Sequence, residues 1–486
     1  MIKVHSILFP LIAWTACAAE VPQWPQFRGP SGAGLAAEDA APPTVFSPAQ
    51  GVAWRADSAV GHGSLCIWAN QIFLLSFDKA GGKLVTTALD RLTGALLWRQ
   101  ALDAAKIEPL HEISNPATAT PATDGERVYV YFGSYGLAAY TLDGTLAWTH
   151  PLPRVDNKFG SGTSPVVAGG LVLLAPTGPG ATLYAFDRRD GAIRWQSPLV
   201  PAGEQGGTGY STPLVWNGQV VLHASGSVAG FDLRHGKRLW GVPVQSIGIG
   251  TPVAGEGSIF VTAFSEGGGP AAHPALPAWE EMLARYDKDK DGRISRDEIG
   301  SGALPVKAPD APAAKPLFSQ VDADHDGYLT RAEWERASAP PIPRPRGLLA
   351  ILPGAEGDAR AARIAWMEPR NTSEVPSPLL YHHRLYMVTI GGIVTCLDPR
   401  DGRVIFRGRL GTSGEYYASP VAAAGRVYFA ARDGAVTVLA EGDDLKVLAR
   451  NELGEEVFGT PAILGDTLYV RTAAHVYAFR DADKAR

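Results

Sequence analysis

The sequence predicts an all-β protein, an eight-bladed β-propeller interrupted by one small α-helical insertion. Three observations lead to this prediction. A motif recurs along the chain at intervals of about 40 to 50 residues, which is the length of one propeller blade. Glycine and proline number 55 and 38 while only 19% of residues are charged, as expected for many short strands joined by tight turns. One segment follows neither the repeat nor this composition.

Each copy of the motif begins at a small hydroxyl-bearing residue, in most copies followed by proline, and continues through four short apolar strands. The copy from Ala119 to Leu152 reads ATPATDGERVYVYFGSYGLAAYTLDGTLAWTHPL and shows the whole unit. Eight starts predict eight blades arranged in a ring. The starts are Ser64, Thr120, Ser164, Thr212, Thr251, Ser377, Ser419 and Thr460.

The two ends of the chain are expected to close this ring. The copy that starts at Thr460 runs out of sequence before its fourth strand, whereas residues 52–58, around Trp54, read as a fourth strand with no copy before them. We therefore expect residues 52–58 to complete the last blade. A ring closed in this way leaves no terminal blade free to pair with another chain.

Two further residues recur within the copies. Turns such as Asp187 to Gly191 end in glycine, which favours the positive φ of a tight hairpin turn between the third and fourth strands. A tryptophan near the end of most copies supplies one large apolar side chain per repeat, as packing between neighbouring blades requires. These tryptophans are Trp98, Trp148, Trp195, Trp240 and Trp366.

The first residues, MIKVHSILFPLIAWTACAAE, have the three parts of a secretory signal peptide, namely Lys3, an apolar run and small residues before the cleavage site. The apolar run is shorter than the roughly 20 residues that a membrane-spanning helix needs. We expect cleavage near Ala18 or Ala19, no transmembrane segment in the mature chain, and a periplasmic or secreted protein. A lipid anchor at Cys17 is the alternative.

Cysteine content and charge exclude two classes of protein. The mature chain keeps only Cys66 and Cys396, each in an apolar stretch, so we expect buried free thiols and no disulfide framework. The formal net charge is -5, and no basic stripe runs along the sequence. A nucleic-acid partner is therefore not expected.

The segment that departs from the repeat contains two twelve-residue stretches, DKDKDGRISRDE at 287–298 and DADHDGYLTRAE at 322–333. Both match the calcium-binding EF-hand loop, in which carboxylates at positions 1, 3 and 5, a carbonyl at position 7 and a bidentate glutamate at position 12 converge on one hard cation. We predict two Ca²⁺ sites. Their ligands would be Asp287, Asp289, Asp291, the carbonyl of Arg293 and Glu298, then Asp322, Asp324, Asp326, the carbonyl of Tyr328 and Glu333.

The neighbouring residues support a paired arrangement. AWEEMLARY before the first loop predicts an amphipathic helix with Trp279, Met282, Leu283 and Tyr286 on one side. Position 8 of the loops, Ile294 and Leu329, is expected to join them through a short β-bridge. Extracellular modules bind calcium at about 10⁻⁴ to 10⁻³ M, which favours a structural clamp over a fast sensor in an exported protein.

The Thr-Pro starts, the AYTLDGTLAW type of turn and the recurring tryptophan resemble the PQQ-like propeller repeat. This repeat occurs in quinoprotein dehydrogenases and in the propeller lipoprotein of the outer-membrane assembly machine. The resemblance covers nearly the whole mature chain outside the insertion, and WPQFRGPSGAG from Trp24 looks like the N-terminal segment of exported bacterial members. It implies the fold, whereas the function of a propeller depends on its sites.

Two functions follow from the resemblance. The first, which we favour, is a binding or assembly scaffold with a protein or polysaccharide partner in the cell envelope. The second is a quinone-dependent dehydrogenase, or another enzyme, with its site in the propeller funnel. Quinoprotein dehydrogenases resemble one another in an adjacent cysteine pair and, in electron-transfer members, a Cys-x-x-Cys-His haem motif, and this chain has neither. We therefore do not expect PQQ to bind, and no catalytic residue is assigned.

Two polar clusters remain as candidates for a ligand. His111, Glu112 and Asn115 precede a first strand, where propeller ligands often bind, but such side chains also tie loop backbone and we favour that role. The pair His382-His383 falls at a predicted turn and is expected to be solvated.

The predictions together divide the chain into five parts. They are a signal peptide (1–19), an N-terminal arm (20–51), blades 1–5 with the closing strand (52–264), the EF-hand pair (265–345), and the rest of blade 5 with blades 6–8 (346–480).

Overall fold

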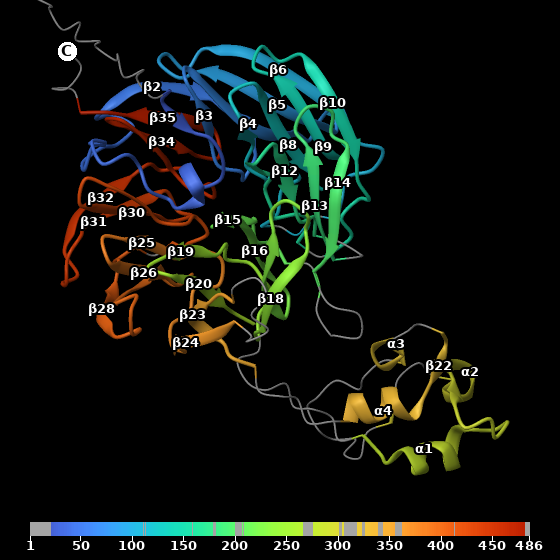
Figure 1. Cartoon of the computed structure of the whole chain (residues 1–486). Helices are drawn as coiled ribbons and strands as arrows, with labels where there is room; N and C mark the ends of the chain where they lie inside the picture. Colours follow the sequence, from blue (N-terminus) through green and yellow to red (C-terminus); the bar gives the residue numbers. More distant parts are fainter. Residues whose placement is uncertain are drawn as a thin grey trace, which may run out of the picture.

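The computed structural model describes residues 21–109, 111, 113–157, 159–177, 181–199, 207, 209–265, 276–300, 304–305, 318–322, 326–338, 344–354, 362–412 and 414–481. Eight antiparallel sheets stand around a common axis as the blades of a propeller (Figure 1). The predicted eight-bladed all-β fold with a small helical insertion is confirmed. First strands of neighbouring blades contact one another, which places them at the axis.

Within a blade the strands pair in order from the innermost first strand to the outermost fourth strand. Blade 1 contains β3 (Cys66–Trp68), β4 (Gln71–Asp78), β5 (Lys83–Asp90) and β6 (Leu96–Asp103), and blade 2 contains β7 (Ala122–Thr123), β8 (Arg127–Phe132), β9 (Gly136–Thr141) and β10 (Leu146–Pro151). Blade 3 contains β11 (Val166–Ala168), β12 (Leu171–Leu174), β13 (Thr182–Asp187) and β14 (Ile193–Pro198). Blade 4 contains β15 (Leu214–Trp216), β16 (Gln219–Ala224), β17 (Ser227–Asp232) and β18 (Arg238–Pro243).

Blades 5 to 8 follow the same order. Blade 5 contains β19 (Val253–Gly255), β20 (Ser258–Ala263), β23 (Gly347–Leu352) and β24 (Arg363–Glu368), and blade 6 contains β25 (Leu379–Tyr381), β26 (Arg384–Val388), β27 (Ile393–Leu397) and β28 (Val404–Arg409). Blade 7 contains β29 (Val421–Ala423), β30 (Arg426–Ala430), β31 (Ala435–Ala440) and β32 (Val447–Glu452). Blade 8 contains β33 (Ala462–Leu464), β34 (Thr467–Arg471), β35 (His475–Phe479) and β2 (Val52–Asp57). β2 pairs with β35, so the N-terminal strand is the fourth strand of blade 8.

A closed circle of hydrogen bonds joins the eight first strands. At each motif start the backbone N–H donates to the side-chain hydroxyl oxygen of the motif start in the next blade, at 2.9–3.1 Å. The series runs through all eight predicted starts, and the last bond, from Thr460 to Ser64, returns to the first blade. The hydroxyl that opens each repeat therefore has a physical role, since it satisfies a buried backbone donor of its neighbour.

The recurring tryptophans lie between blades, as predicted. The Trp148 indole covers Gly191 in the turn of the next blade, where a Cβ would fall 2.6 Å from the ring and where φ is +72°. Its N–H donates to the Arg188 carbonyl of that turn, 3.2 Å away. Four further pairs repeat this arrangement: Trp54 with Gly94, Trp98 with Gly144, Trp195 with Gly236, and Trp366 with Gly402. Only glycine meets both demands, a left-handed backbone and space for the ring.

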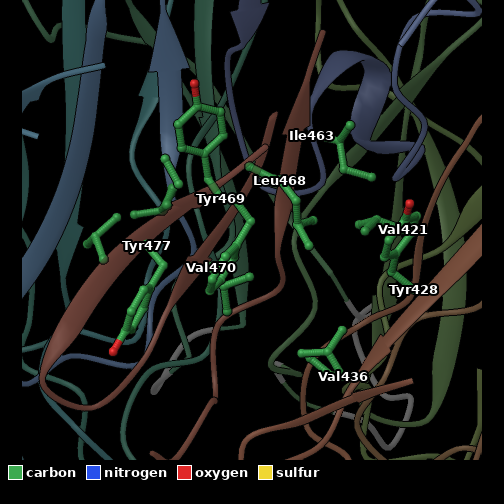
Figure 2. Packing of buried hydrophobic residues seen from close by; sticks show 14 of the residues in the cluster. Val421, Tyr428, Val436, Ile463, Leu468, Tyr469, Val470 and Tyr477 are labelled. Carbon is green, nitrogen blue, oxygen red and sulfur yellow. The ribbon is translucent and has the colours of Figure 1, made fainter. Parts of the chain in front are cut away.

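The core lies between successive blades. Second and third strands are buried along most of their length, since each sheet is covered on both faces by its neighbours. Figure 2 shows the contact between blade 7 and blade 8, where Val421, Tyr428 and Val436 meet Ile463 and Leu468. Cys66 and Cys396 are buried free thiols, as the sequence indicated.

The N-terminal arm crosses the propeller axis. β1 (Gln23–Trp24) adds a fifth strand to blade 1 by pairing with β3. The short 3-10 helix η1 (Pro30–Gly32) then contacts β15 of blade 4, and the buried Arg28 donates to the Pro378 carbonyl of blade 6 at 2.7 Å. Leu35 next bridges Ala422 of blade 7. A segment that touches first strands on opposite sides of the ring fills the axis, near the middle of the ring in Figure 1.

The connections of the blades define two faces. Because antiparallel strands alternate in direction, the loops that lead into first strands and the connections between second and third strands lie at one end of the ring. We call this end the lead-in face. The remaining turns form the turn face, and the arm reaches it where Ala41 N–H donates to the Gly465 carbonyl.

The insertion connects β20 to β23, the second and third strands of blade 5, and is therefore rooted on the lead-in face. It contains α1 (Trp279–Tyr286), β21 (Ile294–Ser295), α2 (Arg296–Ile299), α3 (Phe318–Val321), β22 (Tyr328–Leu329) and α4 (Arg331–Ser338). None of the described helices is long and apolar enough to span a membrane.

Candidate calcium sites and the lead-in face

The first loop brings its acidic side chains together. Ligand oxygens of Asp287, Asp289 and Asp291 lie within 4.8 Å of one another. Gly292, at φ +84°, turns the chain so that its N–H donates to Asp287 Oδ2 at 3.1 Å. This bond from position 6 to position 1 closes the loop around the three carboxylates.

The position-12 glutamate of the first loop is held at the start of α2. Glu298 Oε2 accepts from Ser295 N–H at 2.7 Å, and Glu298 Oε1 accepts from Lys288 N–H at 2.8 Å. Ser295 Oγ in turn accepts from Glu298 N–H, which completes a capping box. The backbone donors of Ser295 and Lys288 keep the pKa of Glu298 below its ordinary value.

The second loop repeats this geometry where it is described. Gly327 N–H donates to Asp322 Oδ2 at 3.2 Å, and Thr330 N–H donates to Glu333 Oε2 at 2.8 Å. Tyr328 N–H donates to Asp326 Oδ1 at 2.8 Å. Asp322 and Glu333 are both buried. Asp324 lies outside the described residues.

The first carboxylate of each loop has an oxygen that fits a cation. Within the described part of the chain, Asp287 Oδ1 and Asp322 Oδ1 are buried and lack a hydrogen-bond partner, although the Oδ2 atom of each carboxylate accepts a loop N–H. A buried anionic oxygen without a partner is costly. A hard divalent cation is the group that satisfies such an oxygen among further carboxylates.

The two loops form one unit. Ile294 pairs with Leu329, and Ser295 with Tyr328, in the predicted β-bridge. The guanidinium carbon of Arg293 lies 4.2 Å from the Tyr328 ring centre, so the two position-7 residues also meet through their side chains. The Arg293 guanidinium additionally pairs with Asp291 at 3.1 Å.

The insertion has a hydrophobic core of its own. The predicted face of α1 supplies buried Trp279 and Met282, with Leu283 and Tyr286 packed against them. Trp279 and Trp334 lie with ring centres 6.2 Å apart, and the Trp334 indole N–H donates to the Pro277 carbonyl at 2.8 Å. This core couples helix packing to loop geometry, because Ile294 and Leu329 belong to it as well.

The root of the insertion is fastened to the lead-in loop of blade 5. Gln245 N–H donates to the Pro345 carbonyl, and Ile247 N–H donates to the Phe264 carbonyl, both at 2.9 Å. The two ends of the insertion thus leave the propeller side by side.

The polar clusters singled out in the sequence do not converge on a common centre in the described residues. Asn115 Oδ1 accepts from Ala117 N–H at 2.8 Å, which is the loop-tying role expected for it. His111 packs on Phe159, and Glu112 lies outside the described residues. The exposed His382 and His383 bond to different glutamates, Glu441 and Glu256 respectively.

Comparison with protein families assigns the propeller. The family model described as outer membrane protein assembly factor BamB (PQQ_2) matches residues 44–281 and 334–483, which is more than half of the chain. The chain belongs to this PQQ-like propeller family. The EF hand model matches residues 280–302 and 314–338, which include both loops of the insertion. No curated protein sequence matches the chain.

Two solved structures that share this fold are distant from the chain in sequence. BamB from Moraxella catarrhalis is 12% identical, with a TM-score of 0.54 over 89% of this chain and 98% of that chain. The computationally designed Ika8 protein is also 12% identical, with a TM-score of 0.52 over 88% of this chain and 99% of that chain. At such identity the likeness shows the PQQ-like propeller fold alone.

Proposed function

We propose that this chain is an exported, calcium-binding PQQ-like propeller that acts as a binding or assembly scaffold in the cell envelope or outside the cell. The calcium assignment rests on the position-1 carboxylates, which have the same hydrogen-bonding arrangement in both loops. Asp287 and Asp322 each hold the loop through one oxygen and leave the other buried without a hydrogen-bond partner in the described residues.

The ion would be held by both predicted ligand sets. In the first loop these are Asp287, Asp289, Asp291, the Arg293 carbonyl and Glu298. The convergence of the three aspartates supports this set. In the second loop Asp322, Asp326, the Tyr328 carbonyl and Glu333 would act in the same way, together with Asp324. Bound calcium supplies positive charge that offsets carboxylate repulsion, and so clamps the two loops together.

The scaffold role rests on family membership and on the N-terminal sequence. The family takes its description from an outer membrane protein assembly factor, which supports a role in the cell envelope. Residues 1–19 carry the signal-peptide pattern that supports export, with lipidation at Cys17 as the alternative route to the same compartment. Residues 1–20 lie outside the described structure. The partner would be a protein or a polysaccharide.

A calcium titration tests this proposal. Calorimetry on the mature chain should show saturable Ca²⁺ binding, and Glu298→Gln combined with Glu333→Gln should weaken it at least tenfold, because each change removes a bidentate carboxylate. Glu335→Gln, on the exposed side of α4, is the matched control and should bind as the wild type does. Circular dichroism should show the propeller folded in all variants. Unchanged calcium binding in the double variant would defeat the assignment.

A further inference from the structure

A cleft separates the closing strand of blade 8 from the sheet of blade 1. It has a volume of about 430 Å³ and lies between β2 on one side and β4, β5 and β6 on the other. Every residue that lines it belongs to the described part of the chain. The cleft stands at the closure of the ring, where β2 completes the last blade. Its volume is in the range that small-molecule sites occupy.

The cleft exists because blade 8 has a small residue where other blades carry a larger one. Each fourth strand directs the residue two positions after its tryptophan toward the next blade. In blade 2 this residue is His150, whose Nδ1 lies 3.0 Å from the Gly191 carbonyl of blade 3. In blade 3 it is Ser197, which donates to the Gly236 carbonyl of blade 4. In blade 8 it is Ala56, which brings only a methyl group to the interface.

A small residue at this position does not leave a cleft by itself. In blade 6 the equivalent residue is Gly408, and Leu445 from the turn of blade 7 takes up the space, since a Cβ on Gly408 would lie 2.2 Å from Leu445 Cδ2. The turn of blade 1 presents Gly94 and Ala95 to the cleft instead. The space at the ring closure therefore results from small residues on both sides.

Blade 1 supplies an apolar floor with hydroxyl groups beside it. Leu74 and Leu89 are buried and belong to the same core cluster as Trp54 of blade 8. Thr87 lies opposite Leu74 in the register of β4 and β5, so both side chains are on the face of blade 1 that lines the cleft. Ser76, also buried, is the next residue of β4 on that face.

One cation shares this face. Arg99 of β6 lies opposite Thr87 in the register of β5 and β6 and lines the cleft. Among the described residues its guanidinium has no hydrogen-bond or ion-pair partner. Arg55 and Asp57 of β2 direct their side chains to the other face of blade 8, because successive residues of a strand alternate. Asp57 lies 3.6 Å from His475 there.

An apolar path leads from the floor to the surface. Leu96 lines the cleft and is 62% exposed, and Leu92 in the same turn is 57% exposed. These are the two most exposed large apolar side chains of the described residues. A ligand that rises from the floor would cover Leu96 as it leaves the cleft.

We propose that the cleft between blades 8 and 1 binds an aliphatic carboxylate, a medium-chain fatty-acid anion, with its chain on Leu74 and Leu89 and its carboxylate bonded to Arg99. This site goes beyond the calcium-binding and scaffold functions. All of its lining residues belong to blades 8 and 1, so it can be tested separately from the calcium loops.

The lining selects this chemistry. The planar fork of a guanidinium binds a carboxylate through two parallel hydrogen bonds. Methylene groups buried on the two leucines would supply affinity in proportion to the length of the chain. A cationic head group would be repelled by Arg99. A sugar would find no aromatic ring to pack on, since the described residues of the lining are aliphatic, small, hydroxyl-bearing or charged.

Calorimetric titration of the mature chain with hexanoate, octanoate and decanoate tests the site. Octanoate should bind the wild type at one site per chain. Each pair of added methylene groups should raise the affinity about tenfold, because both groups leave water. Octylamine, which has the same chain length and a cationic head group, should bind about tenfold more weakly than octanoate or worse.

Two substitutions in the cleft and one control locate the binding. Arg99→Gln should weaken octanoate binding about tenfold, because it removes the charged fork. Ala56→Leu should abolish binding, because the larger side chain fills the cleft. Arg450→Gln is the matched control, since Arg450 has the same repeat position in blade 7, opposite Thr437, and donates to the Leu410 carbonyl. Its octanoate affinity should stay within about twofold of wild type.

The outcomes separate this inference from the calcium proposal. Binding that strengthens with chain length and falls in both Arg99→Gln and Ala56→Leu supports the site, whatever the loops of the insertion bind. If wild type that is folded by circular dichroism binds neither octanoate nor decanoate, the assignment is overturned. Octanoate binding that both cleft variants retain at full affinity would also overturn it, as would equal affinities for octanoate and octylamine.

Discussion

The backbone N–H of Thr460 donates a hydrogen bond of 2.9 Å to Oγ of Ser64, two residues that lie 396 positions apart in the sequence. The bond closes the circle of eight that joins all first strands. β2, a few residues before Ser64, meanwhile forms the outer edge of blade 8. The ring is therefore closed twice, at the axis by a side-chain hydroxyl and at the rim by a strand.

Removing the Ser64 hydroxyl should open the inner closure. In Ser64→Ala the buried N–H of Thr460 loses its acceptor, and we expect the free energy of unfolding to fall by about 1–3 kcal/mol. Urea unfolding followed by circular dichroism measures this change. Ser58→Ala, at a half-buried serine of the same loop whose hydroxyl bonds only to the neighbouring Ala59 carbonyl, should be within about 0.5 kcal/mol of wild type. Equal stabilities for the two variants would show that the circle contributes nothing.

The space under the tryptophans gives a second prediction. Gly191→Ala would place a methyl group 2.6 Å from Trp148 at φ +72°, whereas Gly170→Ala, at φ +82°, would meet no atom within 4 Å. The first variant should lose about 2 kcal/mol more than the second, because it adds steric overlap to a backbone strain that both share. Thermal unfolding of the two proteins makes the comparison. A similar loss of stability in both variants would mean that Gly191 is required only for the conformation of the turn, and not for the space that the Trp148 ring takes up.

Burial of His62 predicts a dependence of stability on pH. Desolvation and nearby Arg471 lower the pKa of His62 to about 4, below the value of about 6.5 expected when the chain is unfolded. The unfolded chain thus binds the proton first, and stability should decline as pH falls from about 6.5 to about 4. His62→Phe, which keeps a ring against Phe458, should show a shallower decline in urea unfolding. Exposed His235→Phe is the control, and identical pH profiles for all three proteins would contradict this prediction.

Calcium removal should act on the insertion and leave the blades folded. The loops share their core with Trp279 and Trp334, so chelation should loosen that core and shift tryptophan fluorescence to longer wavelength. The shift should be reversed by added Ca²⁺ and should be smaller in Trp334→Phe, which lacks one reporter. A fluorescence spectrum that chelator leaves untouched would mean that the loops hold their geometry without an ion.

Much of this fold could be predicted because its signals recur. Hydroxyl starts recur in all eight blades, turn glycines and tryptophans recur in most of them, and the two acidic loops match a fixed spacing of ligands. The crossing of the axis by the N-terminal arm could not be predicted, since β1 has two residues and no periodicity, and its partners are set by the closed ring. Trp240 also differs from the other recurring tryptophans, since its indole N–H donates to Gln219 Oε1 of its own blade.

Only contacts that depend on local spacing could likewise be predicted from the sequence. Ligand positions in the calcium loops follow from local spacing, so the sequence alone places Asp287 beside Asp291. Contacts between blades do not follow from local spacing, because only the folded propeller brings His111 of the blade 2 lead-in loop near Phe159 of the blade 3 lead-in loop.

The inserted loops should hold calcium through their first carboxylates, Asp287 and Asp322. Diffraction data collected at long wavelength from crystals grown with calcium chloride test it most directly, because the anomalous signal locates each ion. We predict one anomalous peak at bonding distance from Asp287 Oδ1 and a second from Asp322 Oδ1. A map with well-ordered loops and no peak at either carboxylate would contradict the account.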